Sequence, residues 1–244
     1  MLGIIGGSGL AKLDGLKNTR RKTARTPYGA ASAALTFGRI GSRDVVFLAR
    51  HGDGHALAPH EVNYRANLWA LKKAGAAEVL SVATVGGIAA SLGPGTLIVP
   101  HQIIDYTWGR PSTYFEGKGT PVQHVDFTEP YSRGLRGKIL KAARACREKV
   151  KDKGVYAATQ GPRLESAAEI ERLARDGADL VGMTAMPEAA LAREISLEYA
   201  AIAVVANYAA GRGASRRAIA LERIPAVLDE AMGRVRRIIE ELCK

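Results

Sequence analysis

The segment Leu2-Gly3-Ile4-Ile5-Gly6-Gly7-Ser8-Gly9-Leu10 decides the fold class. A short apolar run ends in clustered glycines, which is typical of a buried strand followed by a tight turn. Similar runs recur at residues 45–49, 79–83, 97–99, 155–158, 180–183 and 201–206, and they alternate with segments of helical periodicity at 63–74, 135–149, 166–175, 187–197 and 224–242. This alternation predicts one α/β domain over residues 1–244, with a central, mainly parallel or mixed β-sheet flanked by helices.

Two of the predicted helices carry start signals. Ser166 stands three residues before Glu169, which is the spacing of a capping box. Pro187 followed by Glu188 suits a first helical turn. We therefore expect the third and fourth helices to begin near these residues.

Composition and charge limit the classes of partner. The chain has 244 residues and a formal net charge of +11, which attracts anions such as nucleic acid, anionic membranes or phosphate-bearing substrates. Its basic residues are spread along the chain and aromatic residues make up only 6%, whereas nucleic-acid binders concentrate charge and interleave aromatics. No apolar run approaches the roughly 20 residues of a membrane span. We expect neither a nucleic-acid nor a membrane partner.

Cellular location is predicted from the cysteines and the first residues. The two cysteines, Cys146 and Cys243, are too few for a disulfide framework and indicate reduced thiols. The first seven residues lack the basic region and the apolar length of a secretory signal. Together these features predict a cytoplasmic protein.

Small and polar residues follow several predicted strands. The turn Gly6-Gly7-Ser8-Gly9 has the freedom to form an anion-binding nest, although it lacks the Gly-Lys-Ser/Thr of a P-loop and the third glycine of a dinucleotide fingerprint. Arg50-His51, Thr84 and Thr184 also follow predicted strands. Open α/β sheets bind ligands at this edge. We expect Ser8, Arg50, His51, Thr84 and Thr184 to form a phosphate cradle, with the Asn207 amide nearby to bind a heterocycle.

A metal site is the alternative for the segment that follows Arg50. Histidines and carboxylates gather there, at His51, Asp53, His55, His60 and Glu61. Their spacing fits no helical two-histidine ligand motif, and the segment has loop composition. We expect no metal.

The stretch 104–132 breaks the alternation of strands and helices. It is rich in Gly, Pro, Thr, Tyr and His. Irregular segments of this length inside compact domains are usually lids, binding loops or contact surfaces. A surface excursion without a role is the alternative.

Several segments together resemble a known family. Residues 3–10, Leu48-Ala49-Arg50-His51-Gly52, residues 62–72, Gly161-Pro162-Arg163 and residues 177–184 are similar, in order, to the methylthioadenosine phosphorylase branch of the trimeric purine nucleoside phosphorylases. The resemblance implies the single-domain phosphorylase/hydrolase-like α/β fold and a homotrimer. It also implies phosphorolysis, in which inorganic phosphate attacks C1′ of a purine nucleoside as a co-substrate, without a cofactor.

The resemblance assigns roles to individual residues. It places phosphate on the five residues of the cradle and makes Asn207, Arg50 and His51 the catalytic groups. It places Met183 under the ribose, Asn207 at N7 and the C6 substituent of the purine, and His124 of a neighbouring subunit at the 5′ end. Ala83, Leu164, Ala209 and Leu221 complete the predicted substrate site. Two positions depart from the family pattern: Ala83-Thr84 reverses the usual Thr-Ala order, and Leu164 replaces an aromatic residue that packs on the base.

The base site departs from the methylthioadenosine enzymes in a way that has chemical meaning. Those enzymes carry Asp-x-Asp, whereas this chain has Asn207-Tyr208-Ala209. A 6-amino group donates hydrogen bonds and needs a carboxylate, whereas a 6-oxo group accepts and needs a donor such as an amide N–H. A mismatched buried hydrogen bond discriminates strongly between substrates. We therefore expect a 6-oxopurine.

The sugar is decided at the 5′ pocket. Related nucleoside phosphorylases hold the 5′-hydroxyl with a histidine from the C-terminal segment, whereas this chain has Ile219-Ala220-Leu221 in that neighbourhood. An apolar pocket favours a methylthio group, because burying an unpaired hydroxyl costs about 1–3 kcal/mol. The two pockets together predict phosphorolysis of 5′-methylthioinosine to hypoxanthine and 5-methylthioribose 1-phosphate. The alternatives are a purine nucleoside phosphorylase acting on inosine and guanosine, a methylthioadenosine phosphorylase, and a nucleoside- or nucleic-acid-binding protein without catalysis.

Overall fold

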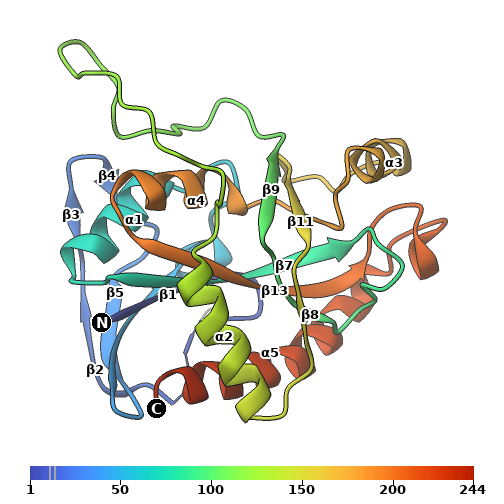
Figure 1. The fold of residues 1–244 in the computed structure, drawn as a ribbon, viewed down its shortest axis with the longest axis horizontal. Coiled ribbons are helices and arrows are strands. Elements are labelled where there is room, and N and C mark those ends of the chain that lie inside the picture. Colours follow the sequence, from blue (N-terminus) through green and yellow to red (C-terminus); the bar gives the residue numbers. More distant parts are fainter. Residues whose placement is uncertain (11, 14) are drawn as a thin grey trace.

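A large mixed β-sheet lies at the centre of the molecule (Figure 1). The structure is a computed structural model that describes residues 1–10, 12–13 and 15–244. Among these residues, eleven strands form one sheet, whose main path runs β10-β8-β13-β7-β1-β6-β5-β2. The strands are β1 (Leu2–Gly6), β2 (Lys17–Lys22), β5 (Leu35–Ile40), β6 (Arg43–Ala49), β7 (Glu78–Gly87), β8 (Leu97–Val99), β9 (Gln102–Asp105), β10 (Val150–Asp152), β11 (Val155–Ala158), β12 (Leu180–Gly182) and β13 (Glu198–Tyr208).

The pairing of these strands confirms the predicted mixed sheet. β1 runs parallel to both β6 and β7, and β13 runs parallel to β7. β12 instead runs antiparallel to the end of β7. The carboxyl ends of β1, β6, β7 and β13 therefore meet at one edge of the sheet. A separate hairpin is formed by β3 (Arg25–Thr26) and β4 (Gly29–Ala30).

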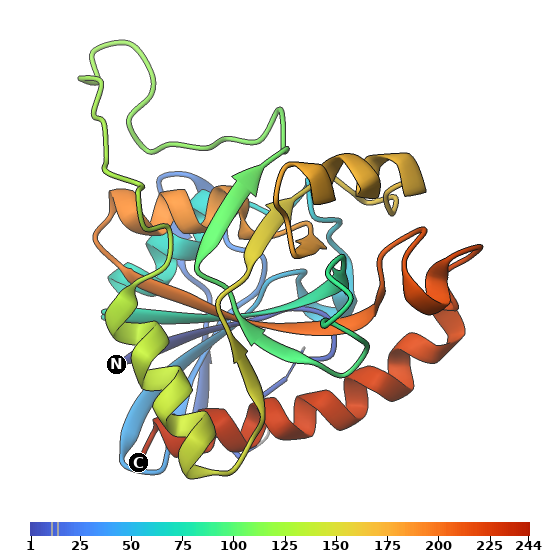
Figure 2. The same ribbon diagram turned by 45° about the vertical axis from the view of Figure 1, so that its right-hand side comes forward.

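Helices cover both faces of the sheet (Figures 1 and 2). α1 (Tyr64–Lys73) and α4 (Ala185–Glu194) lie together on one face, and α2 (Arg133–Ala145) and α5 (Ile224–Leu242) on the other. α3 (Ala167–Arg175) packs with residues of β11 and β12 in a smaller third cluster. The described residues also form three short 3-10 helices: η1 (Asp53–His55), η2 (Gly213–Ser215) and η3 (Leu221–Arg223). Within the described ranges, no helix combines the length and apolar character that a membrane crossing needs.

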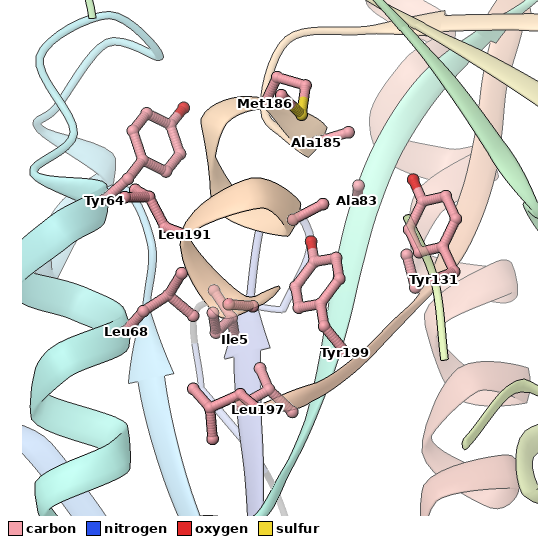
Figure 3. Packing of buried hydrophobic residues seen from close by; sticks show 14 of the residues in the cluster. Ile5, Tyr64, Leu68, Ala83, Tyr131, Ala185, Met186, Leu191, Leu197 and Tyr199 are labelled. Carbon is pink, nitrogen blue, oxygen red and sulfur yellow. The ribbon is translucent and has the colours of Figure 1, made fainter. Parts of the chain in front are cut away.

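The first apolar core lies between the sheet and the α1/α4 layer (Figure 3). Figure 3 shows Leu68 of α1 and Leu191 of α4 packed around Ile5 of β1, with Tyr199 of β13 beside them. These side chains are almost completely buried, and burial of each contributes roughly 1.5–3 kcal/mol. The core fixes α4 against the sheet and so places the residues that precede and begin α4.

The helix start signals agree with the structure. Ser166 and Glu169 form both hydrogen bonds of a capping box at the start of α3. In α4, Met186 has extended dihedral angles (φ −119°, ψ 139°), so regular helical geometry begins at Pro187, as predicted. The predicted end of α2 at residue 149 is wrong, because the helix ends at Ala145 and Arg147 has a positive φ of 60°.

Several strands at or near the edges of the sheet were not predicted from the sequence. β2 is the outermost strand, pairs only with β5 among the described strands, and is exposed at all six positions. An exposed edge strand buries no alternating face, so it lacks the apolar pattern by which strands are recognised. β5, β9 and β10 were missed as well, and β5 carries glycine and polar residues in its middle.

The irregular stretch predicted at 104–132 is present. Its first two residues belong to β9, and residues 106–132 contain neither helix nor strand before α2 begins. Figures 1 and 2 show this segment extending away from the body of the molecule. It exposes large apolar side chains, Trp108 at 72% and Val122 at 79%.

Candidate active site

One cavity of about 530 Å³ lies at the carboxyl edge of the central strands. Its volume suits a small ligand. The described residues that line it include nine of those predicted for the site: Ser8, Arg50, His51, Thr84, Leu164, Met183, Thr184, Asn207 and Ala209. They come from segments as distant as β1 and β13. The fold therefore gathers the predicted phosphate cradle and most of the predicted nucleoside site around one space.

The glycine turn after β1 lines the cavity next to Arg50. The backbone N–H of Gly7 donates to the Val82 carbonyl oxygen at 3.1 Å, and the Thr84 hydroxyl donates to the Ser8 carbonyl oxygen at 3.1 Å. These bonds hold the turn against β7. Thr84 belongs to β7 itself, which extends four residues beyond the predicted end at residue 83. The extension depends on Gly87, where a Cβ would lie 1.9 Å from the Leu92 carbonyl oxygen.

Arg50 is 1% exposed and holds a buried ion pair with Glu188. Its Nε and Nη2 donate to the two carboxylate oxygens at 2.8 and 2.9 Å, while Tyr199 donates to the same carboxylate at 2.7 Å. Burial alone would lower the pKa of the Arg50 guanidinium, but Glu188 reverses this effect and leaves that pKa raised. Arg50 therefore remains charged although it is buried.

His51 is a neutral hydrogen-bonding group in this cavity. Its Nδ1 lies 2.9 Å from the Leu57 carbonyl oxygen, which only accepts, so Nδ1 carries the proton and Nε2 is left as an acceptor. Burial, followed by the charge of Arg50, lowers the pKa of His51 to about 4.

This lowered pKa predicts a dependence of stability on pH. The unfolded chain takes up a proton on His51 near pH 6.5, whereas the folded chain takes it up near pH 4. Stability is therefore full above pH 6.5 and falls as the pH drops toward 4. In urea unfolding between pH 7 and 4.5, we expect wild type to lose about 2 kcal/mol more than His51→Asn. Equal losses in the two proteins would contradict the assignment.

Asn207 reaches the cavity from a β-bulge. The pairing of β13 with β7 shifts register between Val205 and Asn207, and bulges near active sites re-aim side chains. The amide nitrogen of Asn207 donates to the Tyr208 carbonyl oxygen at 2.7 Å. This bond orients the amide and leaves its oxygen and its second N–H for a ligand. Ala209 lines the same wall and is buried.

Three predicted residues do not line this cavity. Ala83 is 4% exposed and belongs to the first core (Figure 3). Side chains alternate along β7, so Thr84 takes the opposite face. Leu221 lies in η3 and is 58% exposed, whereas Ile219 and Ile224 line the cavity in its place. His124 is exposed on the excursion at 106–132, so its role in a neighbouring subunit stays a prediction.

Several residues that line the cavity were not predicted as site residues. Glu165 lines the cavity, and its carboxylate accepts a hydrogen bond from the Thr159 hydroxyl at 2.6 Å. Glu165 could have been predicted because it directly follows Leu164, a predicted substrate-binding residue. Ile219 and Ile224 could be found only as an apolar neighbourhood. Among the described residues, no group of three or more His, Cys, Asp or Glu side chains is arranged to hold a metal ion.

Comparison with known proteins agrees with this geometry. The family model described as "Phosphorylase superfamily" matches residues 1–244. A probable S-methyl-5′-thioinosine phosphorylase from Pseudomonas syringae pv. tomato is 52% identical over 96% of this chain and 94% of its own length. A 6-oxopurine nucleoside phosphorylase from Pyrococcus furiosus is 44% identical over 86% of this chain and 80% of its own.

A solved structure extends the likeness to three dimensions. Methylthioadenosine phosphorylase from Schistosoma mansoni in complex with adenine superposes with a TM-score of 0.93, at 31% identity, over 99% of this chain and 90% of that one. The match covers the elements that surround the cavity as well as the sheet. Because the family model matches residues 1–244 and the Pseudomonas syringae relative is 52% identical over 96% of this chain, the chain belongs to the phosphorylase superfamily.

Proposed function

We propose that the protein catalyses the phosphorolysis of 5′-methylthioinosine to hypoxanthine and 5-methylthioribose 1-phosphate, with residues 1–244 acting as one nucleoside phosphorylase domain. The observation that carries this proposal is the Asn207 amide in the cavity wall beside the side chain of Ala209. An amide supplies the N–H that a 6-oxo group needs, and Ala209 brings no second carboxylate to repel it.

Glu165 supports the same choice of base. A 6-oxopurine carries a hydrogen at N1 and therefore donates there, whereas N1 of a 6-aminopurine only accepts. The Glu165 carboxylate in the cavity wall is an acceptor of that kind. The relatives named above include both a thioinosine and a 6-oxopurine nucleoside phosphorylase, which is consistent with this chemistry.

The choice of sugar rests on Ile219 and Ile224. Both line the cavity, and neither offers a hydrogen bond to a 5′-hydroxyl. A methylthio group loses nothing in such a pocket, whereas a hydroxyl is left unpaired. Phosphorolysis of inosine and guanosine is the second candidate, favoured by the likeness to the 6-oxopurine enzyme.

The mechanism follows from the positions of these groups. As the C1′–N9 bond stretches, positive charge grows on the ribose and negative charge on the purine. Phosphate, held by Ser8, Arg50, His51, Thr84 and Thr184, stabilises the positive charge on the ribose and then attacks C1′. Asn207 stabilises the negative charge on the departing purine. Catalysis then depends on positioning and electrostatics, without a covalent enzyme intermediate and without a cofactor.

The proposal extends to the setting of the enzyme. We infer a homotrimer in the cytoplasm, in which His124 of one subunit reaches the 5′ end of the nucleoside in its neighbour. The exposed excursion that carries His124, and Leu164 at 43% exposure on the cavity wall, support a covering by a second subunit. The partners are a purine nucleoside and phosphate, not nucleic acid or membrane.

A single assay tests the activity. Phosphate-dependent cleavage of methylthioinosine, methylthioadenosine, inosine and adenosine is measured side by side, with a control lacking phosphate. We expect methylthioinosine to give the highest kcat/KM. If kcat/KM for inosine equals or exceeds that for methylthioinosine, the preference for a 6-oxopurine stands but the apolar 5′ pocket is refuted. If kcat/KM is highest for methylthioadenosine, the assignment of Asn207 is refuted.

Replacing Glu165 by glutamine tests the contact to N1. The Thr159 hydroxyl donates to one carboxylate oxygen of Glu165. A glutamine that keeps this bond with its single oxygen turns its NH2 group toward the N1 hydrogen and offers no acceptor there. We expect kcat/KM for methylthioinosine to fall by about 10-fold or more, because a buried donor that loses its acceptor costs roughly 1–3 kcal/mol. The ratio of methylthioinosine to methylthioadenosine activity should fall with it, and an unchanged ratio would exclude this contact.

A further inference from the structure

The guanidinium of Arg50 has almost no freedom in this structure. Glu188 accepts from Nε and from Nη2, the Ser81 hydroxyl accepts from Nη2 at 2.6 Å, and the Val82 carbonyl oxygen accepts from Nη1 at 3.0 Å. A guanidinium has five N–H donors. Four of them are used by these partners, so one N–H of Nη1 remains for a ligand.

The glycine turn meets Arg50 at that same nitrogen. A Cβ on Gly7 would lie 2.7 Å from Nη1 of Arg50 and 2.8 Å from the Val82 carbonyl oxygen. Any larger residue at position 7 would therefore displace the guanidinium or the turn. Nη1 therefore lies against the turn that leads to Ser8, a residue of the predicted phosphate cradle, and both Arg50 and Ser8 line the cavity.

Glu188 is held as firmly as Arg50. It is 0% exposed in α4, and Tyr199 of β13 donates to its Oε1. Figure 3 shows Tyr199 standing between β7 and α4, within the first core. The plane of the guanidinium is therefore fixed by a carboxylate that is itself fixed by the core.

We propose that Glu188 is a positioning residue for phosphate: by taking up two donors of Arg50, it aims the remaining Nη1 N–H of that arginine at the phosphate co-substrate. This inference rests on the proposed function and adds a residue that does not itself line the cavity. Positioning in this way is needed because a donor misplaced by about 1 Å loses much of its effect on a transition state.

Charge alone makes the opposite prediction, which allows a clean test. Removing a carboxylate from the neighbourhood of an anion removes a repulsion, so phosphate would bind more tightly to Glu188→Gln. Positioning predicts weaker binding, because the amide places a donor against one of the Arg50 N–H groups and the guanidinium turns away. The sign of the change in KM for phosphate therefore distinguishes the two.

The experiment compares Glu188→Gln with Glu78→Gln. Glu78 also pairs with two cations, Arg43 and Lys138, but it begins β7 at the edge opposite the cavity. In Glu188→Gln we expect KM for phosphate to rise 10-fold or more while KM for the nucleoside changes less than 2-fold. In Glu78→Gln we expect both constants to stay at wild type, even where the midpoint of thermal unfolding falls.

Direct binding of inorganic phosphate separates this inference from the proposed function. The rise in Tm that phosphate produces reports binding without turnover, and it should shrink in Glu188→Gln. If wild type cleaves no purine nucleoside, the proposed function fails, but this measurement still decides the role of Glu188. Should Glu188→Gln not fold, Glu188→Asp keeps the charge but is one methylene short, and KM for phosphate should again rise. An unchanged or lower KM, or an undiminished Tm rise, in the folded variant would overturn the proposal.

Discussion

Replacing Asn207 by alanine is expected to lower kcat/KM for methylthioinosine by about 10²–10³-fold while the protein stays folded. The amide is the group placed to stabilise the negative charge of the departing purine, and removal of one such donor in other enzymes costs a factor of this size. Its side chain is only half-buried and bonds only to the neighbouring Tyr208 carbonyl among the described residues, so its loss removes little packing. Wild-type kinetics in the variant would refute the assignment.

The companion variant changes specificity. Asn207→Asp combined with Ala209→Asp places two carboxylates at the base, where they accept hydrogen bonds from a 6-amino group and repel a 6-oxo group. We expect the ratio of methylthioadenosine to methylthioinosine kcat/KM to rise by at least about 100-fold, since mismatched hydrogen-bond partners discriminate to that degree. The midpoints of thermal unfolding of both variants serve as the control for folding.

Replacing Arg50 by methionine is expected to lower the free energy of unfolding by about 3–5 kcal/mol, because it leaves the buried carboxylate of Glu188 without its cation. Phosphate-dependent cleavage should vanish with it. Urea unfolding followed by fluorescence measures the first effect, and the nucleoside assay the second.

Two control variants test whether the loss of stability in Arg50→Met comes from the unpaired buried carboxylate of Glu188. Arg21→Met breaks the pair between Arg21 and Asp53, whose side chains are 55% and 73% exposed, and should cost at most about 1 kcal/mol. The double variant Arg50→Met, Glu188→Met replaces the whole pair by apolar groups and should recover most of the stability without recovering activity. A stable Arg50→Met single variant would show that Glu188 is not a buried charge.

The sequence predicted the parts of the fold that bury an apolar face. α1, α3 and α5 begin within one residue of their expected positions, and α3 does so through its capping box. β2 could not be recognised because all of its residues face solvent. The end of α2 was overestimated because alternating Lys, Arg and apolar residues continue past Ala145, although the chain turns at Arg147.

The site was predictable where residues follow strands. Ser8 and Arg50 were predicted to lie together because the carboxyl ends of β1 and β6 meet at one edge, and both line the cavity. Thr184 also lines it, although it follows β12, which runs antiparallel to the end of β7. The ion pair between Arg50 and Glu188 joins residues that are 138 positions apart, and its partner belongs to a helix, so only packing in three dimensions brings them together. Leu221 was predicted to line the cavity, but Ile219 and Ile224 do so instead. The sequence could not show this, because residues 209–224 pass through two short 3-10 helices and have no regular periodicity.

The exposed edge strand β2 bears on how the protein behaves at high concentration. An open edge offers unpaired backbone groups to the edge of another copy, which is a route to aggregation. Four of the six residues of β2 are Lys or Arg, so two such edges that approach each other carry like charges face to face. Part of the +11 net charge therefore opposes pairing between the β2 edges of two copies. Because salt screens this repulsion, we expect the protein to aggregate more readily as the salt concentration rises.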